Sequence, residues 1–233
     1  MISRLVNSWL MGNQCCALCG ARLRVSFHGL CEDCHADLPW LTHCCSRCAL
    51  PLPLHQPALC AHCSRQPPPF NRVLAAFAYN FPINALIPAI KYRKQPAHLG
   101  WLAAVMAEFI HQRHQGPWPD ALIPVPMHPF NQLERGYNQA ELLAARLSRS
   151  LGIPLRQPLK KSRRTRHQME LSMEARRRNL TGAFSLKASP PEYAVLVDDV
   201  MTTGTTLATL SRLLLDQGCR RVDAWILART PEH

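Results

Sequence analysis

The stretch VLVDDVMTTGTTL, residues 195–207, decides the fold of this chain. It begins as an apolar run, carries two adjacent acids at Asp198 and Asp199, and continues through a threonine- and glycine-rich segment into a helical pattern. Such an order predicts a buried strand, a short loop and then a helix. Two neighbouring carboxylates at the end of a buried strand are costly without a partner or a ligand. The sequence therefore predicts a binding site where this strand ends.

The loop after the two acids has the chemistry of a phosphate site. Its residues are Thr202, Thr203, Gly204, Thr205 and Thr206. The N-terminus of a helix presents unpaired N–H groups to an anion, threonine hydroxyls add donors, and a glycine lets the backbone approach closely. The adjacent carboxylates can accept hydrogen bonds from the vicinal hydroxyls of a ribose or hold a hydrated Mg²⁺ ion. The alternative is a plain strand-to-helix turn with an aspartate at the cap.

This stretch resembles the motif that binds 5-phosphoribosyl-1-pyrophosphate (PRPP) in type I phosphoribosyltransferases. By this resemblance, Asp198 and Asp199 bind the ribose hydroxyls, the segment from Thr202 to Thr206 binds the 5-phosphate, and Mg²⁺ accompanies PRPP. One position departs from the pattern, since Thr202 stands where purine-type members often carry an acid that acts on the base. No general base is evident in this loop, and the acceptor of the phosphoribosyl group is not evident either.

Cysteines are concentrated near the N-terminus, where ten of the eleven fall between Cys15 and Cys63. They include four CxxC pairs: Cys16 and Cys19, Cys31 and Cys34, Cys45 and Cys48, and Cys60 and Cys63. The second two pairs repeat the first two after 29 residues. Because CxxC knuckles close tetrahedral Cys₄ sites in pairs, the spacing predicts two sequential ribbons that each bind one Zn²⁺ ion.

Other interpretations of the cysteines are weaker. Disulfides are disfavoured in a reducing cytoplasm, and a thioredoxin-like redox role would need one CxxC rather than four in tandem. Cys15 and Cys44 each precede a pair, so either can replace its neighbour as a ligand. A complete Cys₄ set leaves no open coordination position, so we expect a structural or recognition role for the metal rather than a catalytic one.

A boundary follows the cysteine-rich segment at the triple proline of residues 67–69. We expect a cysteine-rich zinc-ribbon domain at residues 1–69 and a phosphoribosyltransferase-like domain at residues 70–233. Apolar periodicity in the second domain predicts strands at 73–79, 121–125, 155–159, 194–197 and 222–228, and helices at 83–92, 99–112, 138–151 and 205–217. This alternation predicts an α/β fold, with a mostly parallel sheet covered by helices on both faces.

A second polar segment follows the predicted strand at 121–125. It includes Arg135, whose planar guanidinium suits phosphate, and Asn138 at the start of a helix. The run Arg135-Gly136-Tyr137-Asn138-Gln139-Ala140, the element Ile90-Lys91-Tyr92, the Pro-Val-Pro loop, the cysteines and the acid–threonine motif together resemble the ComF/GntX family. The alternative for Arg135 and Asn138 is a surface charge and a helix cap.

The ComF/GntX resemblance implies a phosphoribosyltransferase-like protein linked to competence and to the use of external DNA. It places Val125, Pro126 and Met127 near the diphosphate of PRPP. It also implies that the basic stretch 156–178 forms a mobile hood over the ligand, lined by Arg164 or Arg166.

The basic stretch has other interpretations as well. It carries nine basic and two acidic residues, over half of a net charge of +12. A track for the phosphates of single-stranded DNA and a solvated loop are the alternatives to the hood.

No apolar run approaches the roughly 18 residues that a membrane span requires. Residues 1–14 contain apolar side chains and one arginine, and we expect them to form a short amphipathic helix. The expected location is cytoplasmic, with peripheral contact to the inner membrane as an option.

Two functions stay open at this level. In the first, PRPP binds with Mg²⁺ and an acceptor displaces pyrophosphate at C1 of the ribose. In the second, a non-catalytic protein binds single-stranded DNA through its basic loop and zinc ribbons, beside the DNA-uptake machinery, and keeps a vestigial or sensory PRPP pocket.

Overall fold

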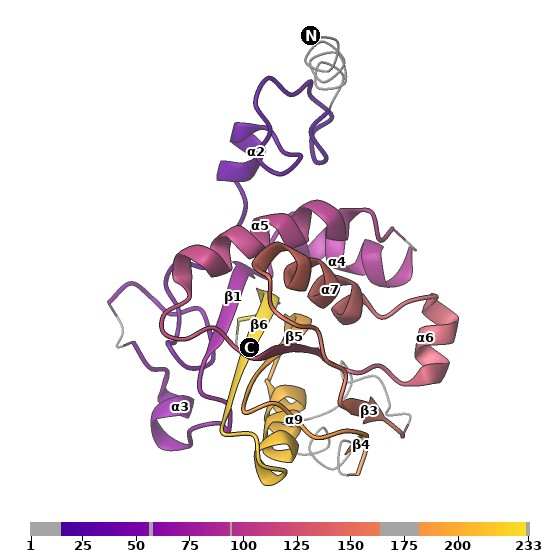
Figure 1. Ribbon diagram of the computed structural model, residues 1–233. Helices are drawn as coiled ribbons and strands as arrows, with labels where there is room; N and C mark the ends of the chain where they lie inside the picture. The colour runs from indigo at the N-terminus through magenta and orange to yellow at the C-terminus, as the bar shows by residue number, and fades with distance from the viewer. Residues whose placement is uncertain (1–14, 56–57, 94, 164–181, 232–233) are drawn as a thin grey trace.

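The computed structural model describes residues 15–55, 58–93, 95–163 and 182–231 (Figure 1). The helix expected at residues 1–14 and the hood residues Arg164 and Arg166 lie outside the described residues. The elements in chain order are α2 (Glu32–Ala36), α3 (Ala61–Arg65), β1 (Val73–Ala78), α4 (Ile83–Tyr92), α5 (His98–Arg113), β2 (Ala121–Pro124), α6 (Pro129–Arg135), α7 (Gln139–Leu151), β3 (Leu159–Lys161), β4 (Phe184–Leu186), β5 (Tyr193–Met201), α9 (Thr205–Asp216) and β6 (Arg221–Arg229).

A four-stranded sheet in the order β1-β6-β5-β2 forms the centre, and every pair of neighbours in it is parallel. Strands β3 and β4 form a separate antiparallel pair. The predicted α/β class with a mostly parallel sheet is confirmed. Because parallel strands all end at the same edge of a sheet, the carboxyl ends of β2 and β5 lie side by side, and ligands of such sheets bind at this edge.

Helices cover both faces of the sheet, with α4, α5 and α7 on one side and α9 on the other (Figure 1). Successive side chains of β5 point to opposite faces of the sheet, so this one strand contacts the helices on both sides. Val195 and Val197 pack into the core beneath α5 and α7, whereas Ala194 and Leu196 pack into the core beneath α9. All four side chains are fully buried, as the unbroken apolar run predicts.

The two cysteine-rich segments contact different parts of this body. The segment that contains α2 stands beyond α5 (Figure 1), and its His28 Nε2 lies 2.8 Å from Glu108 Oε2 of that helix. The later segment runs along β1 and shares a core with α9. There, the Val73 N–H donates to the Arg47 carbonyl at 2.9 Å, and the Leu41 N–H donates to the Ala76 carbonyl at 2.9 Å. A domain boundary at residues 69 and 70 stays a prediction.

Two predicted strands have different bounds in the structure. The strand expected at 155–159 is wrong, because only Leu155 bridges to Leu122 and the next strand, β3, starts at Leu159. The strand expected to end at Val197 continues to Met201 as β5. It continues because its backbone keeps pairing with β6 past the two acids, up to the Met201–Arg229 pair. The acids therefore lie within the strand and not after it.

Candidate functional site

Asp198 and Asp199 lie near the carboxyl end of β5. Asp199 is only 4 % exposed, whereas Asp198 is half-buried. The Asp199 N–H donates to Asp198 Oδ1 at 2.9 Å. A lysine completes the group, since Lys91 at the end of α4 places its Nζ 2.6 Å from Asp199 Oδ2. The acid pair that the sequence predicts is therefore a buried ion pair with a second carboxyl beside it.

The three groups shift one another's ionisation. Burial acts to raise the pKa of Asp199, but the Lys91 ammonium outweighs it and holds that pKa below its usual range. Burial and the neighbouring Asp199 charge raise the pKa of Asp198 well above its usual value. Burial opposes the charge of Lys91, yet Asp199 raises its pKa. Asp199 and Lys91 are thus charged at neutral pH, and Asp198 resists ionisation until a cation enters.

The predicted phosphate loop joins β5 to α9. Gly204 occupies the position before the helix with φ of 75°, a conformation that glycine adopts without strain. A Cβ atom there would stand 2.5 Å from Met201 Cε. Thr202 and Thr203 are exposed, and Thr203 Oγ1 lies 2.8 Å from Thr205 Oγ1. The loop thus presents hydroxyls and the N-terminus of a helix of 12 residues at the edge where the acids lie.

The Arg-Gly-Tyr-Asn-Gln motif ties the neighbouring elements to this edge. Asn138 is 6 % exposed; its Oδ1 accepts from the Ala140 N–H and caps α7, while its Nδ2 donates to the Val125 carbonyl at 3.1 Å. The Tyr137 hydroxyl donates to the Ile90 carbonyl in α4. The motif therefore fixes both the loop after β2 and the helix that carries Lys91.

Arg135 lies at the end of α6. Its Nη1 donates to Gln139 Oε1 at 2.6 Å, and its guanidinium stands 5.4 Å above the centre of the exposed Tyr92 ring. Both partners belong to the family motifs already described. These two contacts hold the Arg135 side chain between α4, through Tyr92, and α7, through Gln139.

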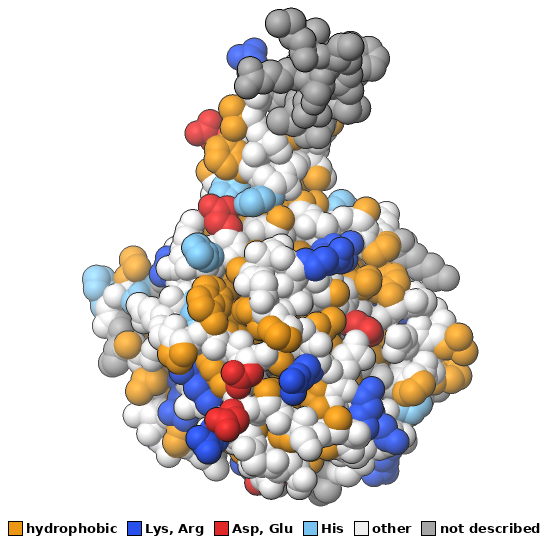
Figure 2. Space-filling view, viewed as in Figure 1, with side chains coloured by type: hydrophobic (Ala, Val, Ile, Leu, Met, Phe, Trp, Pro, Cys, Tyr) orange, Lys and Arg blue, Asp and Glu red, His pale blue; other side chains and the backbone are white. Residues whose placement is uncertain are grey.

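A cavity of about 440 Å³ lies between the loop after β2 and the β3–β4 hairpin, and neither the acid pair nor the phosphate loop contributes to its lining. Pro126, Met127 and Asn138 line it, as do Lys160, Lys161 and Lys187. Basic side chains gather over the hairpin in Figure 2. Burial lowers the pKa of Lys161, while the charge of Asp198 acts in the opposite direction.

Some residues of this region are predictable from the sequence and others are not. Pro126 and Met127 reach the cavity, whereas Val125 is buried beneath it. Lys91 is predictable only as part of a family element, and no local pattern points to Lys187. The sequence signal for Lys91 is that it is the one charged residue of α4, a helix made mostly of apolar residues.

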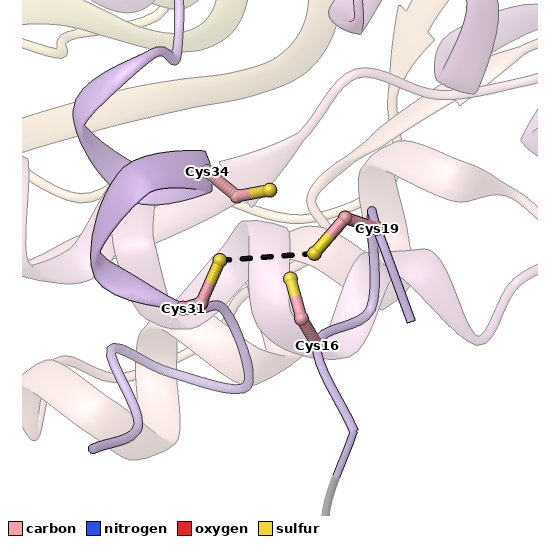
Figure 3. Close-up of side chains that lie close together, drawn as sticks. All are labelled: Cys16, Cys19, Cys31 and Cys34. Carbon is pink, nitrogen blue, oxygen red and sulfur yellow. Dashed lines mark hydrogen bonds between the residues drawn. The ribbon is translucent and has the colours of Figure 1, made fainter. Parts of the chain in front are cut away.

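The eight predicted metal ligands form two groups. Cys16, Cys19, Cys31 and Cys34 form the first group, and Cys45, Cys48, Cys60 and Cys63 form the second group. Within each, all four sulfurs lie within 4.8 Å of one another. In the first group, the four side chains converge on one point (Figure 3), and Cys19 Sγ lies 3.8 Å from Cys31 Sγ.

The sulfur spacing fits a tetrahedral metal ion. Metal–sulfur bonds of about 2.3 Å place the sulfurs of a tetrahedron roughly 3.8 Å apart, whereas a disulfide needs about 2.05 Å. Cys48 Sγ and Cys60 Sγ of the second group are also 3.8 Å apart. Every cysteine is a free thiol, and neither Cys15 nor Cys44 belongs to a group.

One thiol in each group is acidic. Burial acts to raise the pKa of Cys16, but N–H groups of Cys19 and Cys31 outweigh it and bring the pKa to about 6. In the same way, burial of Cys45 is outweighed by the N–H groups of Cys60 and Cys48, and its pKa falls to about 7. Since thiolates are the metal-binding form, one ligand of each group is ready to bind a cation, whereas burial raises the pKa of Cys34, Cys48 and Cys63.

Comparisons with known proteins agree with both halves of the chain. Residues 137–233 match the family model described as "Phosphoribosyl transferase domain". Competence protein F of Haemophilus influenzae is 35% identical over 229 residues, which cover 92% of this chain and 96% of that protein. DNA utilization protein YhgH of Escherichia coli (strain K12) is 34% identical over 171 residues, 71% of this chain and 75% of that protein. Competence protein ComFC of Bacillus subtilis is 32% identical over 109 residues, 43% of this chain and 42% of that protein.

Proposed function

The chain belongs to the ComF/YhgH (GntX) family of competence and DNA utilization proteins, which carry a phosphoribosyltransferase domain, and from this premise we propose that it binds PRPP with Mg²⁺. The 5-phosphate lies against the loop from Thr202 to Thr206, and the ribose hydroxyls bind Asp198 and Asp199. The observation that carries the proposal is the junction of β5 and α9. There, two carboxyl groups at the end of a parallel strand meet a helix N-terminus that begins with a left-handed glycine.

Each part of the proposed ligand meets suitable chemistry. N–H groups at the start of α9 and the threonine hydroxyls donate to phosphate oxygens. The carboxylates accept from the two ribose hydroxyls, and their oxygens also suit Mg²⁺, which would neutralise the pyrophosphate. Lys91 already places a cation 2.6 Å from Asp199, so an entering Mg²⁺ ion competes with an ammonium for that carboxylate.

The proposal names no acceptor. If transfer follows binding, the bond between C1 and the pyrophosphate oxygen breaks while C1 bonds to a nucleophile. Thr202 supplies no general base, so charge stabilisation and positioning would carry such a step.

Titration calorimetry with Mg²⁺ and PRPP tests the binding claim. We expect a dissociation constant in the micromolar to sub-millimolar range for the wild type. Asp199→Asn should weaken it by at least about tenfold, because the loss of a charge-assisted hydrogen bond costs roughly 1.5–3 kcal/mol. Asp216→Asn, at the exposed far end of α9, is the matched control and should change nothing. Absence of binding by the wild type at millimolar PRPP would refute the proposal.

The metal in both cysteine groups is proposed to be zinc in a structural role, because an all-thiolate tetrahedral set is the usual zinc ligand set. Elemental analysis of the purified protein should return two zinc ions per chain. Cys34→Ser, which removes one ligand of the first group, should leave one. A count of one in the wild type, or oxidised cysteines without zinc, would contradict the assignment.

Binding of single-stranded DNA is a second candidate function, and the relatives' names and the lysines of the cavity favour it. Lys160, Lys161 and Lys187 line the cavity, basic side chains gather over the β3–β4 hairpin in Figure 2, and Phe130 and Leu133 of α6 are exposed. Lysines suit the phosphates, and the exposed ring of Phe130 suits stacking on a base of a single strand. If the protein has this function, the PRPP pocket either senses the ligand without catalysis or is vestigial.

Salt dependence tests the second candidate. The affinity for a fluorescent oligodeoxythymidine should fall steeply with salt, and each lysine of the cavity changed to glutamine should reduce the logarithmic slope by roughly 0.7. Arg212→Gln on α9, also exposed, is the control. A slope near zero for the wild type would exclude this function.

No helix in the part of the chain that the structure describes is long and apolar enough to span a bilayer. A cytoplasmic location, contact with the inner membrane and association with the DNA-uptake machinery remain parts of the proposal.

A further inference from the structure

Arg229, the last residue of β6, connects two features that lie far apart in the sequence. Its side chain is buried, with 3 % exposure. Nε donates to the Cys48 carbonyl at 3.2 Å. Nη1 shares its two hydrogens among the carbonyls of Met201 at 3.2 Å, Thr230 at 2.7 Å and Thr202. One guanidinium therefore joins the second cysteine group to the first residue of the phosphate loop.

At the cysteine end, the bond goes to a residue that also supplies a metal ligand. Cys48 is 7 % exposed, and its Sγ lies 3.8 Å from Cys60 Sγ. The next residue, Ala49, has φ of 54° and donates its N–H to the Cys45 carbonyl at 2.9 Å. A left-handed conformation is strained for alanine and needs support from its surroundings. A metal ion that draws the four sulfurs together gives this support and so fixes the direction of the Cys48 carbonyl.

At the loop end, the bonds set the direction of two peptide planes. In a trans peptide the C=O and the following N–H point in opposite directions. Arg229 holds the carbonyls of Met201 and Thr202, and the Thr230 N–H also donates to the Met201 carbonyl at 3.1 Å, so the N–H groups of Thr202 and Thr203 point away from the guanidinium. Met201 itself is buried, and its side chain fills the space beneath Gly204. The guanidinium therefore aims donors of the loop toward the side from which a phosphate approaches.

The first cysteine group offers an internal comparison. Its segment packs against α5, where His28 pairs with Glu108 and a Cβ on Gly29 would lie 3.8 Å from Trp101 Cβ. The second group contributes Cys45 and Cys63 to the same core as α9 and Phe70. Thus the two groups have similar ligand sets but different neighbours.

We propose that Arg229 is a positioning residue through which a metal ion in the second group orders the phosphate loop. Loss of that ion would release the Cys48 carbonyl, loosen the guanidinium and free the peptide plane between Thr202 and Thr203, while the Thr230 N–H keeps the Met201 carbonyl in place. Metal in the first group has no such effect. The inference rests on the proposed function only for the identity of the ligand. By linkage, a ligand that orders the loop must in turn tighten metal binding in the second group.

The test uses the full-length zinc-loaded protein and the variant Arg229→Lys, which keeps the charge but loses the fork that reaches both ends. Arg221→Lys is the matched control, since Arg221 begins the same strand and pairs with Asp223 at 2.8 Å. Three quantities are measured: alkylation rates of each cysteine group under chelator, hydrogen exchange of the amides at 201–206, and calorimetric affinity for Mg²⁺ and PRPP.

In Arg229→Lys we expect alkylation of the second group to accelerate about fivefold or more, with the first group unchanged. Loop amides should exchange faster, and PRPP should bind about tenfold more weakly. PRPP should slow alkylation of the second group in the wild type and in the control, and not in the variant.

Unchanged alkylation and exchange in Arg229→Lys would overturn the inference, and so would equal acceleration in both cysteine groups, which reports general destabilisation. A wild type that binds no PRPP would defeat the proposed function instead. Alkylation and exchange would then still decide whether Arg229 couples the second group to the loop.

Discussion

Lys91→Met should lower the free energy of unfolding by about 3–5 kcal/mol at pH 7, the usual cost of removing one partner of a buried ion pair. Lys91 Nζ lies 2.6 Å from Asp199 Oδ2, and the carboxylate side chain is only 6 % exposed. Methionine keeps the length of the side chain, so the loss reports the charge and not the packing. Urea denaturation of both proteins measures the difference.

A double variant supplies the control for the lysine. Lys91→Met combined with Asp199→Asn should recover much of the lost stability, because no charge is then left without its partner. A deficit below about 1 kcal/mol for Lys91→Met alone would show that the pair behaves like an exposed one.

The pH dependence of the same pair follows from the directions of its shifts. Asp199 has a folded pKa below its unfolded value of 3.8, so its contribution to stability is present above that pH and lost as pH falls through the folded pKa. Lys91 has a folded pKa above 10.5, so its contribution is present below that pH and lost as pH rises through the folded pKa. In Lys91→Met, burial is the largest remaining influence on Asp199 and raises its pKa, against hydrogen bonds with Asp198 and Gln139 that lower it. The deficit of the variant should therefore shrink as the pH falls below neutral and Asp199 takes up a proton.

Cys63→Ser should destabilise the protein far more than Cys34→Ser, although the two residues occupy equivalent places in the repeat. All four cysteines of the second group are buried, whereas only one of the first group is. The second group also shares a core with Phe70 and Leu210, beneath α9. Cys16 of the first group also joins a core of the body, the one beneath α5, but the other three cysteines of that group are more exposed. Loss of metal from the second group should therefore disturb the main body more than loss from the first.

The expected effect is a melting temperature lowered by more than about 10 °C for Cys63→Ser, at roughly 2–4 °C per kcal/mol for a chain of this size. The metal contributes apparent free energies of about 10–16 kcal/mol in small zinc domains, as much as the whole stability of a typical protein. Cys34→Ser should leave the main transition in place. Circular dichroism melts, paired with zinc content, measure both. Equal shifts for the two variants would contradict the packing described for the second group.

Local patterns in the sequence predict much of this architecture. The apolar run before Asp198 fixes a strand buried on both faces, and the CxxC spacing fixes two groups of four sulfurs. The predicted end of β5 is wrong because two acids are typical of a strand terminus. Here their backbone goes on pairing with β6, and Lys91 offsets the buried charge of Asp199.

Contacts between distant residues could not be predicted in this way. Lys91 and Asp199 are separated by more than 100 residues, and Arg229 lies 181 residues from Cys48. No local periodicity relates such pairs, since they meet only where α4 and the second cysteine group pack against the folded sheet. The cavity lysines depend on the β3–β4 pairing in the same way.

A crystal structure of the protein with PRPP and Mg²⁺ tests the central claim most directly. The account predicts the 5-phosphate within hydrogen-bonding distance of the backbone N–H groups at 203–206, with the ribose hydroxyls on Asp198 and Asp199. PRPP found only among the cavity lysines, with the loop empty and Lys91 still on Asp199, would contradict it.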